Sequence, residues 1–404
     1  MKILVVNFPA YGHNIPTVGF IKELINRKVD VDVILSKQIY LNTIINEVIS
    51  STGANIIICD EIEEDKEIYK RHPLGRLAAS ICMTAYTYIK KSKYDAIVYD
   101  FFLFPVFYYA ELVGIPAIRF FSSWAYNKDL YNHMFEEKEK DLIQNKWFVE
   151  IVNTFMNILE KEENKFNKKS IKAEIIDNVP PLNIVGVMKE LQPCAVDFDE
   201  RYVFVGMTIT KIKSDLSIHY DKSNNKKIVY VSFGTMVNVI EPDHGKELFE
   251  KIMMAFKDEN VQVIMSVGLG LSIDELSSIP SNFSVYQYVP QTEILSNADL
   301  FITHGGMNSI NESIYFGVPM IALPGGHDQF ANAEQIENKK IGYYLERKSF
   351  TSNQLKKLAK DILFKDDEIK SNIKYMQGKL RSIDSSVKIA NLIINYITKN
   401  TSFK

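Results

Sequence analysis

The stretch that decides the fold spans residues 288–332 and reads YVPQTEILSNADLFITHGGMNSINESIYFGVPMIALPGGHDQFAN. Its middle predicts a short buried strand, LFIT, that runs into a turn, HGG, at 304–306. A helix is expected to begin near Met307 and to end near Phe316, before a glycine. A second apolar strand, VPMIALP, follows the helix. A strand, a glycine turn, a helix and another strand in this order are typical of a parallel α/β sheet.

The glycine turn and the first helical residues are suited to bind an anion. Two glycines, Gly306 among them, let backbone N–H groups approach a ligand closely, and the positive end of the helix dipole points the same way. His304, Asn308 and Ser309 can add side-chain hydrogen-bond donors. Simple capping of the helix is the alternative explanation for Asn308 and Ser309. We interpret this turn as a binding site for a diphosphate.

The rest of the chain alternates strands and helices in two halves. In the first half, apolar strands are expected at ILVVNF, VDVDVILS, ANIIICD, YDAIVYD and IPAIRFFS. A polar stretch without apolar periodicity then predicts a linker, and the pattern restarts with KIVYVSFGT. We expect an α/β protein with two doubly wound, Rossmann-like domains that face each other across a cleft. The expected boundaries are 1–210 for the first domain, 211–227 for the linker, 228–385 for the second domain and 386–404 for a C-terminal helix that could pack on the first domain.

The composition is that of an ordinary globular protein. With 46% apolar and 24% charged residues in 404, two domains are expected. The net charge of −3, from 47 basic and 50 acidic side chains, gives no electrostatic case for nucleic acid or an anionic membrane surface. The N-terminus reads as a strand and not a signal peptide, and no apolar run is long enough for stable membrane insertion. Three scattered cysteines, Cys59, Cys82 and Cys194, fit a reducing compartment, so we expect a cytoplasmic protein.

Two residues at the ends of first-half strands could form an acid–base pair. His13 follows the first strand in the loop PAYGHN, and Asp100 ends the strand AIVYD. If these strands are neighbours, the Asp100 carboxylate could orient the imidazole, and His13 could act as a general base. For each residue taken alone, packing or helix capping is the simpler explanation.

Further polar residues extend the expected site in the second half. Glu312 shares a helix face with Asn308 and could accept hydrogen bonds from ribose hydroxyls. Asp328 and Gln329 follow a buried strand and could bind hexose hydroxyls, although solvated turn residues explain an isolated Asp-Gln pair. Thr235, in the glycine turn after the strand KIVYVS, could contact the same diphosphate from the other side.

Two other classes of site do not fit the residues present. The pattern GxGxxG is absent after the first strand, which argues against a nicotinamide enzyme. The triplet Asp197-Phe198-Asp199 could hold a metal, but it lies in an acidic loop without an apolar strand before it. No His, Asp and Glu residues have metal-ligand spacing, so we expect no metal and no other cofactor.

Taken together, these motifs resemble those of the family 1 glycosyltransferases of the two-domain GT-B fold, and most of all the bacterial macrolide-type UDP-glycosyltransferases. The plant branch carries W-x-P-Q, then H-C-G-W-N-S-x-x-E, then D-Q. The same spacing appears here as YVPQ at 288–291, HGGMNSINE at 304–312 and DQ at 328–329. This chain departs from the plant pattern by Tyr288 in place of Trp, and by Gly305 and Met307 in place of Cys and Trp.

The resemblance implies a role for each matching residue. The uracil would lie against Tyr288 and the backbone of Val289, and the ribose would be held by Gln291 and Glu312. The other implied roles are diphosphate binding by Thr235, His304, Gly306, Asn308 and Ser309, sugar binding by Asp328 and Gln329, and base catalysis by His13 with Asp100 as its partner. The acceptor would lie in the first domain near five aromatic residues, for most of which core packing is the simpler explanation: Phe101, Phe102, Phe121, Trp124 and Tyr126.

The implied reaction is an inverting, metal-independent transfer of a sugar, with glucose from UDP-glucose as the favoured donor. The acceptor would be a hydroxyl of a small, partly apolar molecule such as a macrolide, a flavonoid or another phenolic compound. Three alternatives stay open: a membrane-lipid acceptor, a UDP-sugar epimerase of the same fold, and a nucleotide-sugar binder without activity. An epimerase would use several catalytic carboxylates, whereas this chain offers mainly His13 with Asp100, which favours transfer.

Overall fold

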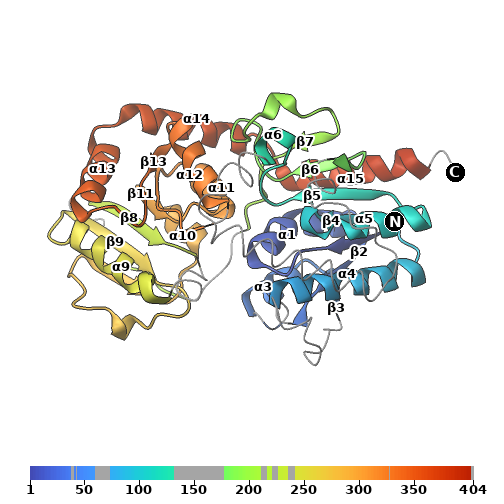
Figure 1. Cartoon of the computed structure of the whole chain (residues 1–404), viewed down its shortest axis with the longest axis horizontal. Helices are drawn as coiled ribbons and strands as arrows, with labels where there is room; N and C mark the ends of the chain where they lie inside the picture. Colours follow the sequence, from blue (N-terminus) through green and yellow to red (C-terminus); the bar gives the residue numbers. More distant parts are fainter. Residues whose placement is uncertain are drawn as a thin grey trace. The chain divides into compact units, whose positions relative to one another are not determined.

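The protein is described here by a computed structural model, which covers residues 1–37, 41, 43–59, 73–131, 177–210, 216–220, 226–234, 242–326 and 328–401. The chain divides into two compact units, which we call unit 1 (Met1–Thr210 with Ile383–Lys404) and unit 2 (Lys211–Ser382). Each unit contains one parallel β-sheet packed against helices (Figure 1). The expectation of two doubly wound α/β domains is confirmed.

Unit 1 is built on a seven-stranded sheet with the order β3-β2-β1-β4-β5-β6-β7, in which all neighbours are parallel. Its strands are β1 (Lys2–Val6), β2 (Asp30–Leu35), β3 (Asn55–Ile58), β4 (Ala96–Asp100), β5 (Ala117–Phe121), β6 (Asn183–Val185) and β7 (Tyr202–Phe204). Its helices are α1 (Tyr11–Asn26), α3 (Thr43–Ser50), α4 (Pro73–Lys91), α5 (Pro105–Val113), α6 (Lys128–Tyr131) and α15 (Ser385–Thr401), with short 3-10 turns at Phe101–Leu103 and Ala195–Asp197.

The strands of this sheet are apolar on both faces because helices cover both. Ile3 and Val5 of β1 pack in one core with α1, α3 and α15, whereas Leu4 and Val6 pack in another with α4 and α5. Successive side chains of a strand point to opposite faces, so a continuous apolar run is what a doubly covered strand requires. The C-terminal helix α15 therefore completes the core of unit 1.

Unit 2 is built on a six-stranded parallel sheet with the order β10-β9-β8-β11-β12-β13. Its strands are β8 (Lys227–Ser232), β9 (Val261–Ser266), β10 (Phe283–Tyr286), β11 (Leu300–Thr303), β12 (Met320–Ala322) and β13 (Gly342–Tyr344). Its helices are α9 (Pro242–Phe256), α10 (Gln291–Leu295), α11 (Met307–Phe316), α12 (Gln329–Asn338), α13 (Ser352–Phe364) and α14 (Asp367–Arg381), with a 3-10 turn at Ile273–Glu275. The predicted bounds of α11 are confirmed, and Gly317 ends it with a φ of +72°.

In both sheets the strand order reverses beside the first strand of the unit. The reversal lies between β1 and β4 in unit 1, and between β8 and β11 in unit 2. Ligands of open α/β sheets bind outside the carboxyl ends of the strands at such a point. The segments that follow these four strands are therefore where a ligand of each unit is expected.

One expectation about local structure is wrong. His13 was expected in a loop, but α1 already begins at Tyr11, so His13 lies in the first turn of that helix. The side-chain amide of Asn14 donates hydrogen bonds to the carbonyls of Phe8, at 2.9 Å, and Ala10, at 2.8 Å. These contacts stabilise the start of the helix in a segment whose glycine and prolines read as a loop.

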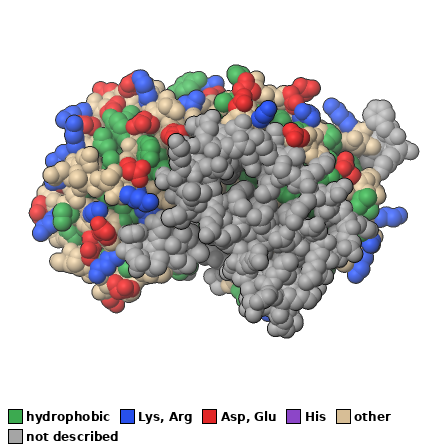
Figure 2. All heavy atoms as spheres, viewed as in Figure 1, with side chains coloured by type: hydrophobic (Ala, Val, Ile, Leu, Met, Phe, Trp, Pro, Cys, Tyr) green, Lys and Arg blue, Asp and Glu red, His purple; other side chains and the backbone are tan. Residues whose placement is uncertain are grey.

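The surface of the described residues carries charges of both signs. On the face that Figure 2 shows, Lys and Arg side chains are interspersed with Asp and Glu side chains, as a net charge of −3 leads one to expect. No helix in the described part of the chain is long and apolar enough to cross a membrane.

Candidate active site

His13 and Asp100 meet at the point of strand reversal in unit 1. Nδ1 of His13 lies 2.7 Å from Oδ2 of Asp100, whose side chain is buried. The other carboxylate oxygen of Asp100 accepts a hydrogen bond from the backbone N–H of Phe102 at 3.0 Å. Asp100 thus caps the turn after β4 and also contacts His13. Its geometry therefore agrees with both alternatives from the sequence, a helix cap and a partner of His13. A carboxylate fixed by the backbone can hold the imidazole in one orientation.

Ser122 is a third residue at this imidazole, and the sequence analysis missed it. Its Oγ lies 3.0 Å from Nδ1 of His13, and its side chain is buried. The sequence signal that could have identified Ser122 is its position directly after β5, the strand next to β4. A carboxylate accepts only, so Nδ1 of a neutral His13 carries the hydrogen that Asp100 accepts, and Nε2 keeps the lone pair that a base needs.

Aromatic rings surround His13. The ring centroids of Phe8, Phe101 and Phe102 lie 5.1 Å, 6.3 Å and 5.6 Å from that of His13. Of the five aromatic residues predicted to contact an acceptor, only Phe102 is partly exposed; the others are buried: Phe101, Phe121, Trp124 and Tyr126. The acceptor contacts of these four residues stay predictions, although a side chain enclosed in a core offers a ligand little surface. Phe102 stays a predicted contact.

In unit 2, the ring of His304 lies between two glycine turns. Gly305 has a φ of +81°, which glycine adopts without strain. A Cβ atom on Gly306 would lie 2.5 Å from Nε2 of His304, nearer than such atoms approach, so only glycine leaves room for the ring there. A Cβ atom on Gly234, in the turn after β8, would lie 3.3 Å from Cε1 of the same ring. The turns after β8 and β11 therefore enclose one imidazole.

This imidazole is neutral at pH 7. Burial, and then the positive charge of Arg347, lower the pKa of His304 to about 4. Nδ1 is buried and makes no hydrogen bond within the described part of the chain, while the residue as a whole is partly exposed. A neutral imidazole carries one N–H, so His304 can donate one hydrogen bond to an anion at the turn.

Three residues predicted to hold the ribose or the diphosphate form one network. Nε2 of Gln291, at the start of α10, donates to Oε2 of Glu312 at 2.7 Å and to Oγ of Ser309 at 3.2 Å, both on α11. The hydroxyl of Tyr230 donates to Oε1 of Gln291 at 3.4 Å. Tyr230 lies inside the apolar run of β8 and gave no sign of a polar role in the sequence. Asn308 is partly exposed beside this network, at the start of α11.

A buried asparagine joins the glycine turn to the predicted sugar-binding pair. Nδ2 of Asn332 donates to the carbonyl of Gly305 at 2.8 Å and to Oδ2 of Asp328 at 3.1 Å. Oε1 of Gln329 accepts from the backbone N–H groups of residues 325–326 at 2.9 Å and 3.2 Å. The turns after β11 and β12 are thus tied together, and Asn332 is a further residue that the sequence analysis missed.

The remaining predicted donor residues precede α10 or follow β8. Tyr288 is partly exposed and Val289 is buried, directly before α10. Thr235 lies outside the described residues, so its predicted contact with a diphosphate stays a prediction.

Comparison with known proteins finds one family that matches part of the chain and relatives that are similar over nearly all of it. Residues 198–388 match the family described as UDP-glucoronosyl and UDP-glucosyl transferase. The chain is similar to the uncharacterized UDP-glucosyltransferase YojK of Bacillus subtilis, at 27% identity over 99% of this chain and 98% of that protein. It is 29% identical to the NDP-glycosyltransferase YjiC of the same organism, over 98% of each protein. Residues 198–388 thus match the UDP-glycosyltransferase family, and the chain is similar to such enzymes over nearly its whole length. The solved glycotransferase of kitacinnamycin shares its fold, with a TM-score of 0.78 at 24% identity over 97% of each chain.

The resemblance to UDP-glycosyltransferases of the GT-B fold is therefore confirmed. The family match includes the network of α10 and α11 and the turns at 304–306 and 325–329. It does not include His13 or Asp100, whose proposed roles rest on their geometry and on the resemblance of their motifs.

Burial of Glu312 makes the stability of this glycosyltransferase depend on pH. Burial raises the pKa of Glu312 to about 7, although the hydrogen bond from Gln291 opposes the shift. The folded protein then holds this proton more tightly than the unfolded chain does, so stability falls as pH rises from about 4.5 to about 7. Glu312→Gln removes that cost and should raise the free energy of unfolding at pH 8.5 by roughly 1–3 kcal/mol, but change it little at pH 5.

Urea unfolding of the wild type and Glu312→Gln at both pH values measures this difference. The exposed residue Glu337 on α12 offers the control, because Glu337→Gln should leave the free energy of unfolding unchanged at either pH. An equal effect of Glu312→Gln at pH 5 and pH 8.5 would contradict a buried, titrating carboxyl group.

The triplet discounted as a metal site has a structural partner. Both carboxylate oxygens of Asp199 accept hydrogen bonds from Arg201, the shortest at 2.6 Å from Nη2. Within the described ranges, no three or more His, Cys, Asp and Glu side chains are grouped so that they could hold a metal ion.

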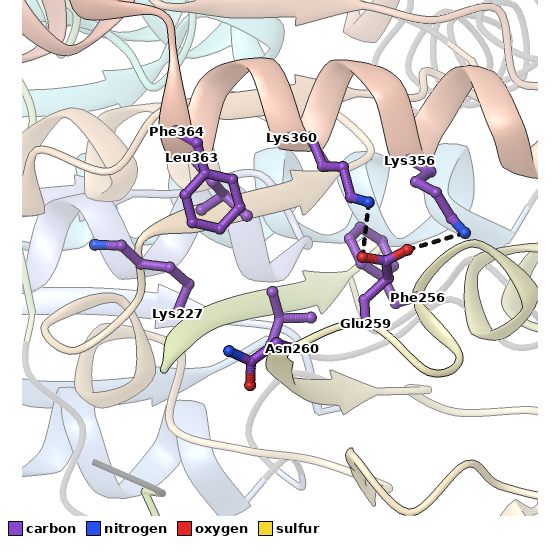
Figure 3. A pocket seen from close by; sticks show the side chains of 10 residues that line it. Lys227, Phe256, Glu259, Asn260, Lys356, Lys360, Leu363 and Phe364 are labelled. Carbon is purple, nitrogen blue, oxygen red and sulfur yellow. Dashed lines mark ion pairs between the residues drawn. The ribbon is translucent and has the colours of Figure 1, made fainter. Parts of the chain in front are cut away.

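A pocket of about 290 Å³ lies where β8 and β9 begin, at the edge of the unit 2 sheet opposite to the glycine turns (Figure 3). The carboxylate of Glu259 forms ion pairs with Lys356, at 3.0 Å, and Lys360, at 2.9 Å, both on α13. Lys227 pairs with Asp299 at 2.7 Å. These cations are already paired within the protein, and the pocket lies at the amino ends of the strands, so it is not the nucleotide-sugar site.

Proposed function

We propose that this UDP-glycosyltransferase transfers glucose from UDP-glucose to a hydroxyl group of a small, partly apolar natural product, with inversion and without a metal ion. The observation that carries the proposal is the hydrogen bond between His13 and Asp100 at the point of strand reversal in unit 1. A macrolide, a flavonoid or another phenolic compound is the proposed acceptor. The relatives YojK and YjiC, named as a UDP-glucosyltransferase and an NDP-glycosyltransferase, support a nucleotide-sugar donor, and the glycotransferase of kitacinnamycin supports a natural-product acceptor.

In the proposed reaction, Nε2 of His13 takes the proton of the acceptor hydroxyl while the acceptor oxygen attacks the anomeric carbon. The bond between that carbon and the diphosphate oxygen breaks, and UDP leaves with the electron pair. The carboxylate of Asp100 stabilises the imidazolium that forms. Displacement in line from an α-linked donor gives a β-linked product. Transfer requires that unit 2 present the anomeric carbon to His13.

The proposed leaving-group site is the start of α11. Its first backbone N–H groups have no partner within the helix, and the positive end of the helix dipole coincides with them. His304, Asn308 and Ser309 add donors at the same place. Fixed dipoles of this kind stabilise charge that develops in the transition state, which supports transfer without a metal ion. Asp328 and Gln329, tied to the glycine turn through Asn332, are proposed to bind the sugar hydroxyls.

Product analysis tests the proposal. The protein is incubated with UDP-glucose, UDP-galactose, UDP-N-acetylglucosamine or dTDP-glucose, each with a macrolide, a flavonoid and a simple phenol, with and without EDTA. We expect a product heavier by one hexose from UDP-glucose, with a β linkage by NMR and an unchanged rate in EDTA. Transfer from other donors alone would overturn glucose, and loss of activity in EDTA would overturn metal independence. Conversion of the UDP-sugar without an acceptor would indicate an epimerase instead.

A further inference from the structure

Arg347 is a cation enclosed at the carboxyl edge of the unit 2 sheet. The backbone N–H of Leu345 continues the pairing of β13 with β12 by donating to the carbonyl of Ala322 at 2.9 Å, and Arg347 follows two residues later. Its side chain is 9% exposed. Removing a guanidinium from water is costly, so a protein places one at this depth only where other interactions offset the cost. The edge where it lies is the one that carries the nucleotide-sugar site.

Arg347 and His304 both lie against the segment that follows β8. The guanidinium carbon of Arg347 lies 5.8 Å from the centroid of the Phe233 ring. Parallel pairing places Ser232 of β8 beside Thr303 of β11, so Phe233 and His304 follow at the same level on adjacent strands. The next residue, Gly234, approaches the His304 ring so closely that a Cβ atom would lie 3.3 Å from Cε1. Arg347 therefore contacts the segment that holds the His304 ring in place.

We propose that Arg347 is a positioning residue of the nucleotide-sugar site, which provides a fixed positive charge behind His304 for the diphosphate of the donor and of the departing UDP. The inference rests on the proposed function, because it takes the turn at 304–309 as the diphosphate site. Arginine suits such a place, since its guanidinium stays charged at every relevant pH and is weakly hydrated. In a site closed to water, a fixed charge acts on a nearby anion more strongly than it would in solvent.

The same charge determines the protonation of His304. Burial and the charge of Arg347 together lower the pKa of this imidazole to about 4, so it does not become a second cation at neutral pH. Arg347 keeps its charge throughout this range, and His304 adds none between pH 5.5 and 8. Without Arg347, the pKa of His304 should rise, although burial, the larger cause, still holds it below the ordinary value. A diphosphate bound beside the ring would raise it further, so that protonation in mild acid partly replaces the missing charge.

The test compares the dissociation constant of UDP at pH 8 and pH 5.5 by titration calorimetry, for the wild type, Arg347→Met, Arg347→Gln and Arg347→Lys. Loss of the charge should weaken UDP binding about tenfold at pH 8 and by a smaller factor at pH 5.5, where a bound diphosphate favours protonation of His304. Arg347→Lys keeps the charge and should stay within about threefold of the wild type at both pH values. UDP itself and the other titratable groups of the site, Glu312 and Asp328 as well as His327 outside the described residues, are the same in every protein, so each variant is compared with the wild type at the same pH.

Arg381 provides a matched control. It donates to the carbonyl of Tyr315 at 2.7 Å, at the end of α11 that lies about 15 Å from the diphosphate turn. Arg381→Met removes the same charge from unit 2 and should leave the dissociation constant of UDP unchanged. Thermal unfolding of each variant identifies one that does not fold, and the Gln and Met variants provide two independent ways to remove the charge.

The outcomes separate the inference from the proposed function. If the wild type does not bind UDP, the proposed donor site fails, and the inference fails with it. If the wild type binds UDP and the charge-removing variants bind it equally well, Arg347 has no part in the site. A loss that is the same at pH 8 and pH 5.5, and as large in Arg347→Lys, would show that Arg347 only supports the packing around Phe233. A loss that shrinks in acid, with Arg347→Lys close to the wild type, supports the inference.

Discussion

His13→Ala is expected to lower the rate of sugar transfer by about 10²–10⁴-fold, because a positioned general base contributes roughly that factor. Nδ1 of His13 is engaged by Asp100 and Ser122, so Nε2 is the nitrogen that can take the proton of the acceptor. Alanine at this position removes the only imidazole that the described part of unit 1 offers. Binding of UDP should be unchanged, since the predicted donor contacts all belong to unit 2.

Asp100→Asn separates orientation from base strength. The asparagine oxygen can still accept from the backbone N–H of Phe102, so the turn after β4 should keep its shape. The amide facing His13 no longer carries a charge that stabilises the imidazolium, and it can favour the wrong tautomer by donating to Nδ1. We expect a fall in the transfer rate on the order of 10²–10⁴-fold here as well, with little change in thermal stability.

Initial rates with UDP-glucose and an accepted phenol, together with calorimetric titration of UDP, measure both effects. His219 is exposed and belongs to unit 2, so His219→Ala is a histidine control that should keep the wild-type rate. Turnover of His13→Ala within a fewfold of the wild type would exclude this residue as the base. Loss of UDP binding in His13→Ala would instead place the nucleotide at unit 1.

The donor side of the site could be predicted from the sequence because its residues are close together along the chain. The turn at 304–306 and the helix that follows are encoded by one strand, two glycines and a C-terminal glycine, all local signals. The network of Gln291, Ser309 and Glu312 spans only 22 residues, and its spacing matched a family pattern. A local signal also marks the start of α13, where the Thr351 side chain accepts a hydrogen bond from the backbone N–H of Gln354.

The residues that sequence analysis missed act through contacts between distant strands. Ser122 reaches His13 only because β5 lies beside β4, and nothing in the run IPAIRFFS indicates which histidine its hydroxyl will meet. Tyr230 contacts Gln291 of the predicted donor site, and Arg347 contacts Phe233, both across strands, and an isolated tyrosine in an apolar run reads as core. Burial is equally hard to predict: four aromatic residues next to a predicted base were expected near an acceptor, and the structure packs them inside the unit.

Gly306→Ala is expected to disable donor binding while leaving the protein folded. The added Cβ atom would lie 2.5 Å from Nε2 and 3.0 Å from Cε1 of His304, so the ring must leave its place between the two glycine turns. The backbone φ of Gly306 is −65°, which alanine adopts without strain, so the cost falls on His304 and not on the turn. Loss of the imidazole contact and crowding of the first N–H groups of α11 should weaken UDP binding by about 10–100-fold.

Gly378, a glycine within α14, provides the control for Gly306→Ala. A Cβ atom on Gly378, within α14, would meet nothing within 4 Å, so Gly378→Ala should keep the wild-type affinity for UDP and gain about 0.5–1 kcal/mol of stability from helix propensity. Calorimetric titration of UDP and thermal unfolding of both variants provide the two readings. Wild-type affinity in Gly306→Ala would mean that neither the His304 ring nor the turn beneath it takes part in binding the diphosphate. A loss of affinity confined to Gly306→Ala, with both proteins folded, would place the diphosphate at the start of α11, where the dipole of the helix and the imidazole of His304 converge.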